Sequence, residues 1–173
     1  VHNYGIPGDV DGLQNVADKY NLPLIYDAAP TMGVKYKGKT ILHYGDLAVL
    51  SFHATKIFTT FEGGAIISRS KEMKIKIDQI KNFSILDEEK IAGLGINGKM
   101  NELEAAMGLL QLKYLDGAIE NRKVVYEEYE NQIREINGVR MNTIPDPVEY
   151  NYAYVPIFFD NGQAIRDHIY NDY

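Results

Sequence analysis

The chain has no cysteine, no tryptophan and no long apolar run. Without cysteine, disulfide bonds and thiolate metal sites are excluded, and an intracellular protein is expected. The apolar segments are too short to cross a bilayer and no signal peptide is recognisable, so we expect a cytoplasmic protein without a membrane partner. The four histidines lack the spacing of metal ligands, so we expect no metal site.

Positive charge is also scarce. The sequence has 18 basic and 24 acidic residues, a net charge of -6, and no basic cluster. These features exclude a nucleic-acid-binding surface. With 45% hydrophobic and 24% charged residues, 173 residues can form one ordinary core and part of a second domain. Because Val1 is not an initiator methionine and a helical pattern runs to Tyr173, we expect a fragment of a longer protein.

The apolar pattern alternates between helical and strand periods. Helical spacing predicts helices over 9–20, 71–83, 101–114 and, after a break at Asp116-Gly117, up to 136, with a last helix after Asn161-Gly162. Apolar runs predict strands over 22–26 and 46–52, after Gly64, and over 153–159. The segments between them predict a loop or hairpin over 31–45, a mobile loop over 84–92 and a proline-bearing loop over 141–150. This order is typical of an α/β protein.

One lysine stands where an apolar strand passes into a loop. The segment Ser51-Phe52-His53-Ala54-Thr55-Lys56 is followed by a Gly63-Gly64 turn and a second apolar strand. Ligand sites in open α/β sheets favour this position, and a partly desolvated lysine can attack a carbonyl carbon. Most loop lysines are simply solvated, so the position of Lys56 alone leaves both interpretations open.

Three polar residues near strand ends have similarly open interpretations. Asp27 follows an apolar strand, where it could cap a turn or face a ligand. Ser51 could be a hydrogen-bonded strand serine or a ligand contact. His2 could face a ligand, but a loop histidine with a local hydrogen bond is the commoner case.

Three segments, in order, resemble the DegT/DnrJ/EryC1/StrS family of pyridoxal-phosphate (PLP) aminotransferases, which aminate keto groups on nucleotide-linked sugars. They are Tyr26-Asp27-Ala28-Ala29, the Ser51–Lys56 segment with Glu62-Gly63-Gly64, and Gly95-Ile96-Asn97-Gly98-Lys99-Met100 leading into the helix near Ala105. The resemblance extends from Val1 to about Tyr154. It implies the type I (aspartate aminotransferase-like) PLP transferase fold, a mostly parallel sheet with flanking helices, here incomplete at both ends.

The resemblance also implies a role for each matched residue. Lys56 would hold PLP as a Schiff base and later move a proton. Asp27 would keep the pyridine nitrogen protonated, and Ser51 would donate to the cofactor phosphate. Asn97 would reach across a dimer interface to the partner's cofactor phosphate. Where relatives have His or Gln, this chain has Pro30, which leaves the contact to the ring oxygen unassigned.

The implied reaction is amino transfer from an amino acid, with glutamate as the expected donor, to a nucleotide-linked keto-sugar. It would serve bacterial cell-surface polysaccharide or antibiotic sugar biosynthesis, in a homodimer with shared active sites. Residues 1–115 would belong to the large PLP-binding domain and 116–173 to the smaller C-terminal domain. In the family, the phosphate-binding turn and the ring-stacking aromatic residue precede the position of Val1. The alternatives are therefore a truncated non-catalytic or regulatory homologue without PLP, or a plain α/β binding domain.

Overall fold

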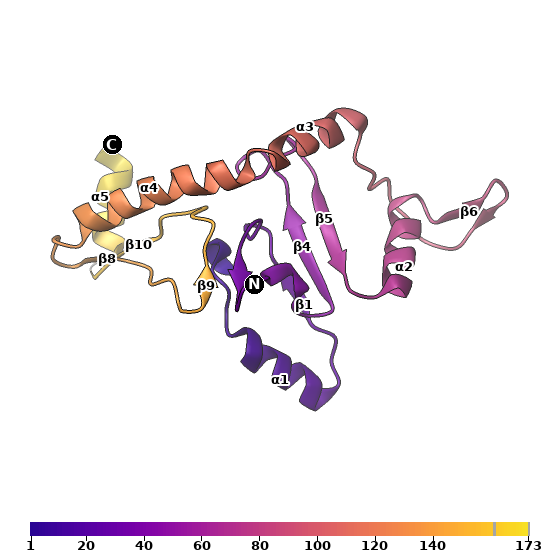
Figure 1. Ribbon diagram of the computed structural model, residues 1–173, viewed down its shortest axis with the longest axis horizontal. Helices are drawn as coiled ribbons and strands as arrows, with labels where there is room; N and C mark the ends of the chain where they lie inside the picture. The colour runs from indigo at the N-terminus through magenta and orange to yellow at the C-terminus, as the bar shows by residue number, and fades with distance from the viewer. Residues whose placement is uncertain (161, 173) are drawn as a thin grey trace.

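A three-stranded sheet lies at the centre of the computed structural model, which describes residues 1–160 and 162–172 (Figure 1). Its strand order is β1 (Ile25–Asp27), β4 (Leu47–Ser51), β5 (Gly64–Ser68). β1 and β4 are parallel, as the resemblance implies for most of the sheet. β5 instead runs antiparallel to β4, because segment 52–63 turns the chain back without a crossover helix. The parallel part of the sheet in this chain is therefore the β1–β4 pair.

The first helix and the first hairpin form where the sequence predicts them. α1 (Val10–Tyr20) begins at Asp9, whose carboxylate accepts from the Gly12 amide at 2.9 Å, and ends at Asn21 with a left-handed φ of 50°. β2 (Lys35–Tyr36) and β3 (Lys39–Thr40) form a hairpin, and β2 also pairs with β9 (Val148–Glu149). Two short 3-10 helices, η1 (Asn3–Gly5) and η2 (Ile41–His43), lie nearby.

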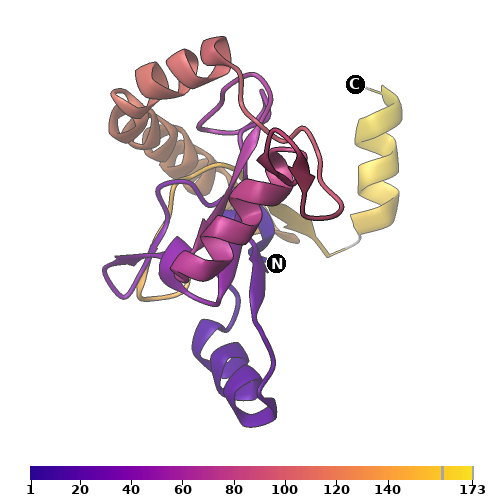
Figure 2. The ribbon, with the colours of Figure 1, turned by 90° about the vertical axis from the view of Figure 1, so that its right-hand side faces the viewer.

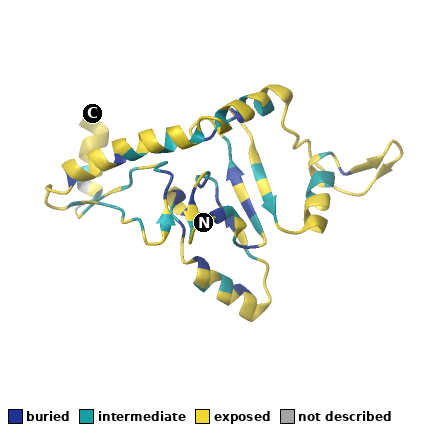
Figure 3. Ribbon diagram, viewed as in Figure 1, coloured by how far each residue is buried: buried dark blue, intermediate teal, exposed yellow. Residues whose placement is uncertain are grey.

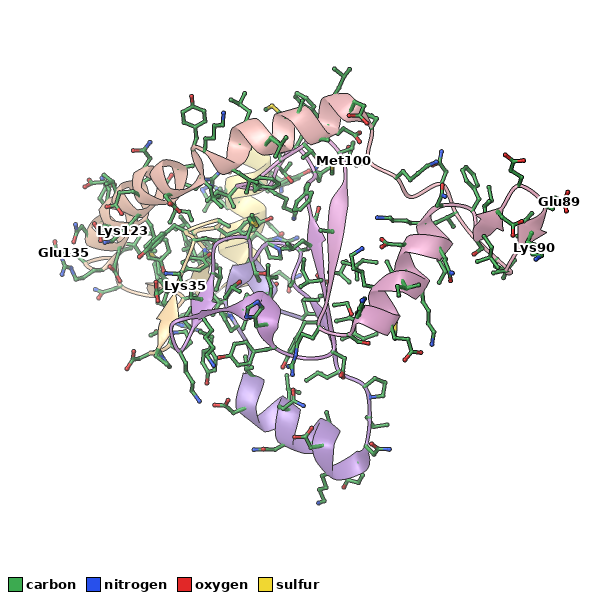
Figure 4. All side chains as sticks on the ribbon, turned by 45° about the vertical axis from the view of Figure 1, so that its right-hand side comes forward. Lys35, Glu89, Lys90, Met100, Lys123 and Glu135 are labelled. Atoms are coloured by element: carbon green, nitrogen blue, oxygen red, sulfur yellow. The ribbon has the colours of Figure 1, made fainter. Side chains whose placement is uncertain are left out.

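The segment after β5 forms α2 (Lys71–Lys81), the hairpin of β6 (Ile85–Asp87) and β7 (Lys90–Ile91), and α3 (Glu102–Leu112). The predicted mobile loop over 84–92 is therefore a hairpin. It extends away from the sheet, with Glu89 and Lys90 at its outer end (Figure 4). None of the α2 residues is buried, and its apolar side chains Met73 and Ile80 are 39% and 48% exposed.

α4 (Leu115–Ile133) begins after a break at Lys113 and Tyr114, so the break predicted at Asp116-Gly117 is wrong. Among its apolar residues, Val124 and Tyr129 are exposed, whereas Tyr126 and Ile133 are buried. α4 contacts β8, and Tyr126 belongs to a core cluster that includes Val10 and Tyr150.

The C-terminal segment contains β8 (Val139–Met141) and β10 (Ile157–Phe159), which pair antiparallel, and α5 (Gly162–Asp172). β10 starts later than predicted because residues 150–154 form a turn, with Tyr152 at a φ of 54°. The turn predicted at Asn161 lies outside the described residues. In two perpendicular views, α1 lies at one end of the central sheet and α3 and α4 at the other (Figures 1 and 2).

Buried residues gather around β1 and β4, and a few lie on α1 and α4 (Figure 3). One cluster contains Val10, Val34, Ile41, Tyr126 and Tyr150, and a second contains Tyr26, Ala28 and Ala48. The first cluster combines residues from both sides of position 115, and the division into domains at that position stays a prediction. None of the described helices has the length and apolar character needed to cross a membrane.

Candidate active site

The carboxyl end of β1 lies between two other segments. On one side, the backbone amide of His2 donates to the Asp27 carbonyl at 2.9 Å. On the other side, the Ala28 amide donates to the Val49 carbonyl of β4 at 2.9 Å. The Asp27 carboxylate accepts from the Ala29 amide at 3.1 Å. Asp27 therefore lies at the strand edge where ligands bind in open α/β sheets, with the segment 1–3 on one flank and β4 on the other.

Lys56 is held by the loop that connects β4 and β5. Its backbone amide donates to the His53 carbonyl at 2.9 Å, and the next two residues, Ile57 and Phe58, are buried. These contacts fix the backbone on both sides of the lysine. The half-buried side chain then brings Nζ to 3.3 Å from the Tyr154 hydroxyl oxygen and 5.9 Å from the centroid of that ring.

Asp27 and Lys56 line the same pocket. Its volume is about 260 Å³, near the lower end of the range for small-molecule sites, and its wall is made by Val1, His2, Asn3, Tyr4, Asp27, Ala29, Pro30, Lys56 and Tyr154. A larger pocket of about 650 Å³ lies between α4 and β8 and contains none of the predicted site residues. By volume alone, the larger pocket would be the candidate for the functional site. The smaller pocket is the better candidate, because an amine and a carboxylate both line it.

The other two predicted site residues do not line this pocket. Ser51 is half-buried at the end of β4, where its hydroxyl accepts from the His53 amide at 3.3 Å. Asn97 is exposed and forms an isolated bridge with Asn82. Within one chain, therefore, the structure brings two of the four predicted residues together.

The His2 ring lies in the core beside the site. It is 1% exposed, stacks on Tyr26 with ring centroids 4.4 Å apart, and accepts at Nδ1 from the Gly8 amide at 3.4 Å. Burial is the main reason that its pKa is lowered from 6.5 to about 4. His2 is therefore neutral at pH 7, and the interpretation as a histidine with a local hydrogen bond is confirmed.

His53 lies on the surface of the loop between β4 and β5. Its side chain is 48% exposed, and Nδ1 lies 2.9 Å from the Thr55 hydroxyl. Nε2 lies 3.6 Å from the Glu62 carboxylate. All of these contacts are made within the loop, by a side chain that is half exposed.

Sequence reasoning missed Tyr154, which it placed inside a strand. Its contact with Lys56 spans 98 residues of chain, and local patterns do not encode such a distance. The sequence contains only a weak indication of a role for Tyr154, which is the alternation of Tyr150, Tyr152 and Tyr154 shortly before β10.

The pocket's side chains fit PLP by their chemistry. An amine can bond to the aldehyde carbon, and a carboxylate is the expected partner for a protonated pyridine nitrogen. Within residues 1–160 and 162–172, no group of three His, Asp or Glu side chains could hold a metal ion. The donor set therefore favours an organic cofactor with an aldehyde over a metal centre.

The class of protein follows from comparison of the fold with solved structures. The crystal structure of DesI in the presence of its TDP-sugar product matches with a TM-score of 0.86 at 32% identity, covering 92% of this chain and 41% of that one. The aminotransferase TlmJ from Streptoalloteichus hindustanus has the same fold, with a TM-score of 0.91 at 22% identity, covering 99% of this chain and 48% of that one. The fold is that of the sugar aminotransferases.

The family is shown by sequence as well. The model of the DegT/DnrJ/EryC1/StrS aminotransferase family matches residues 1–172, and the chain belongs to this family. It is 46% identical to a dTDP-4-amino-4,6-dideoxy-D-glucose transaminase of Shigella dysenteriae, over 99% of this chain and 47% of that protein. A transaminase of the same description from Escherichia coli is 40% identical, over 98% of this chain and 46% of that protein. The chain thus spans about half the length of these relatives.

Proposed function

We propose that the protein to which this chain belongs is a PLP-dependent aminotransferase that aminates a nucleotide-linked keto-sugar, with an amino acid, expected to be glutamate, as the donor. The observation that supports it most is the shared pocket of Lys56 and Asp27, which come from different strand ends. The names of the two dTDP-sugar transaminases support a dTDP-linked 6-deoxy keto-sugar as substrate. Cell-surface polysaccharide or antibiotic sugar biosynthesis would be its setting.

PLP, when bound, supplies an electron sink for the carbon that loses a proton. The chain's own residues would place and protonate it. The Asp27 carboxylate would favour a protonated pyridine nitrogen, because an opposite charge close by favours the charged form. Lys56 would hold the cofactor through its amine and, when that amine is free, would carry the proton. The Ser51 hydroxyl would donate to the phosphate.

We further propose a homodimer in which Asn97 reaches the partner's cofactor phosphate, in a cytoplasmic protein. Its position supports this role, because Asn97 is exposed and lies outside the pocket of its own chain. The division into a large domain over 1–115 and a smaller one over 116–173 belongs to the same proposal.

The full-length protein mixed with PLP tests the chemistry. We expect a visible absorption band in the wild type and in Lys35→Ala, which removes a surface lysine that pairs with Glu149 at 2.7 Å. The band should be absent in Lys56→Ala. Absence of the band from the wild type as well would favour a non-catalytic homologue, and an undiminished band in Lys56→Ala would place the linkage on another amine.

A rate comparison tests the substrate. With glutamate as donor, we expect faster amination of a dTDP-linked 4-keto-6-deoxyhexose than of the UDP-linked equivalent, measured by chromatography of the amino-sugar product. Equal rates, or a preference for the UDP-linked sugar, would contradict the nucleotide assignment while leaving the aminotransferase assignment intact.

A further inference from the structure

Tyr154 is the side chain that meets the Lys56 amine. Its hydroxyl oxygen lies 3.3 Å from Nζ, and its ring centroid lies 5.9 Å from the same atom, within the range of a cation–π contact. On its other side the ring makes an edge contact with Tyr4, with centroids 5.8 Å apart. Tyr154 therefore lies between the lysine and the wall formed by the amino-terminal segment.

The backbone of Tyr154 is fixed by one buried hydroxyl. The Tyr150 hydroxyl lies 2.7 Å from the Tyr4 carbonyl oxygen and 3.1 Å from the Tyr154 carbonyl oxygen, and it accepts from the Tyr154 amide at 3.3 Å. Burial raises the pKa of Tyr150 to about 12, so this group stays protonated at any pH at which an enzyme works. A single side chain thus connects Tyr154 to the opposite wall of the pocket.

Asn151 fixes the same turn to a third wall. Its side chain is fully buried, and Nδ2 donates to the Pro30 carbonyl at 2.8 Å and to the Met32 carbonyl at 2.9 Å. Oδ1 accepts from the Ala153 amide at 3.1 Å, which closes the turn before Tyr154. With both amide hydrogens and the oxygen paired, Asn151 holds the turn at a set distance from Pro30 and therefore from Asp27.

We propose that Tyr154 is a positioning residue for Lys56, held in place by Tyr150 and Asn151. The inference rests on the proposed function, in which the lysine amine leaves the cofactor and must return to the same place in every cycle. A hydroxyl can accept from an ammonium group or donate to a neutral amine, so Tyr154 can hold Lys56 in both protonation states. A lysine side chain without this contact explores several rotamers, and a misplacement of about 1 Å can cost about 100-fold in rate.

Tyr154→Phe in the full-length protein isolates the hydroxyl, because the ring and its contact with Tyr4 remain. We expect kcat to fall about 10- to 100-fold with KM for the amino-acid donor changed less than about twofold. The matched control is Tyr152→Phe, a neighbouring tyrosine that packs against Tyr126 and Tyr150 rather than Lys56. Its kcat and KM should equal those of the wild type.

A second readout needs no cofactor. In the PLP-free protein, the rate of Lys56 acetylation at a fixed pH, followed by mass spectrometry, reports how freely the amine reacts. Because the Tyr154 hydroxyl lies 3.3 Å from Nζ, Tyr154→Phe should release the amine and raise this rate. The rate at Lys35 on the surface should stay the same, whereas a general loss of folding would raise both rates.

Tyr150→Phe provides a variant one step further from the amine. It leaves Tyr154 intact but releases its backbone, so kcat should fall in the same direction and by less, with KM unchanged. If Tyr154→Phe and wild type share the same kcat and the same rate of Lys56 labelling, the positioning role is refuted. A rise in KM alone would also refute it, because it would make Tyr154 a substrate contact. Failure of the wild type to bind PLP at Lys56 would instead refute the proposed function, while the labelling comparison would still report on Tyr154.

Discussion

At the scale of single residues, the chemistry of the site depends on which groups are charged. Asp27 and Lys56 face a common pocket as ordinary exposed and half-buried groups, whereas His2, two residues into the chain, is buried and neutral. Its Nε2 and the hydroxyl of the stacked Tyr26 have no hydrogen-bond partner among the described residues. The core beside the site therefore contains a histidine whose protonated form is disfavoured. The effect of this histidine on the free energy of unfolding can be measured.

Stability should consequently depend on pH through His2. Its folded pKa of about 4 lies below the ordinary 6.5, so between these values the unfolded chain binds a proton that the native protein does not. The free energy of unfolding is therefore highest above pH 6.5 and falls as the pH drops towards 4, by an amount on the order of 1–3 kcal/mol. His2→Phe keeps an aromatic ring on Tyr26 without a titrating group.

Denaturant unfolding of wild type and His2→Phe at several pH values between 7.5 and 4 measures this contribution. The wild type should lose free energy of unfolding more steeply than the variant across this interval. Two parallel curves would show that the imidazole titrates alike in the folded and unfolded states, contrary to its burial.

The sequence allowed prediction of Asp27 and Ser51 at strand ends and of Lys56 in the loop that follows, because a short apolar run fixes where a strand stops. The sharing of one pocket by Asp27 and Lys56 is also what adjacent parallel strands predict. Tyr154 could not be found in this way. Its position depends on a turn closed by Asn151, and the partners of that side chain, such as the Pro30 carbonyl, lie more than a hundred residues earlier in the chain.

At the scale of helices and strands, capping side chains mark where helices begin. The capping box at Asn101 and Glu104 is present, with the Glu104 amide donating to Asn101 at 2.9 Å and the Asn101 amide donating to Glu104 at 3.2 Å. Which face of a helix is buried was less predictable. Tyr126 on α4 is buried, whereas Val124 is exposed, because the neighbours that cover α4 come from distant parts of the chain.

The strand pair that carries Ser51 depends on a glycine. A Cβ atom at Gly64 would lie 2.6 Å from the Leu50 carbonyl oxygen, so Gly64→Ala would force β5 away from β4. We expect a loss of about 1–3 kcal/mol in the free energy of unfolding. Gly117→Ala is the matched control, because Gly117 lies in α4 with no neighbouring atom within 4 Å of the added Cβ and should gain up to about 1 kcal/mol.

Chemical denaturation of Gly64→Ala, Gly117→Ala and wild type under the same conditions measures these changes in the free energy of unfolding. Equal stability of Gly64→Ala and wild type would mean that β4 and β5 can separate without cost. In that case the position of Ser51 would not depend on the close approach of the two strands.

At the scale of the whole molecule, many large apolar side chains lie on the surface of the described chain. Leu94 is 97% exposed and Leu103 on α3 is 81% exposed, both near the segment that carries Asn97. Exposed apolar groups of this size are typical of surfaces that contact another chain or another part of the same protein. They support the proposed dimer in which the segment around Asn97 lies against a partner.

Mixed dimers test this arrangement. Lys56→Ala and Asn97→Ala should each have little activity as homodimers of the full-length protein. When the two variants are unfolded and refolded together, about half of the dimers are mixed, and each mixed dimer has one site with both residues intact. Activity should therefore return to about a quarter of the wild-type value. No recovery would mean that Asn97 acts in its own chain or not at all.

The central claim is that the amine of Lys56 is the group that bonds to PLP. The most direct measurement is reduction of the PLP-treated full-length protein with borohydride, followed by digestion and mass spectrometry. The account predicts that the pyridoxyl group is found on the peptide containing Lys56 and on no other lysine peptide in stoichiometric amount. A modification at another lysine, or an unmodified Lys56 peptide in a protein that binds PLP, would contradict it.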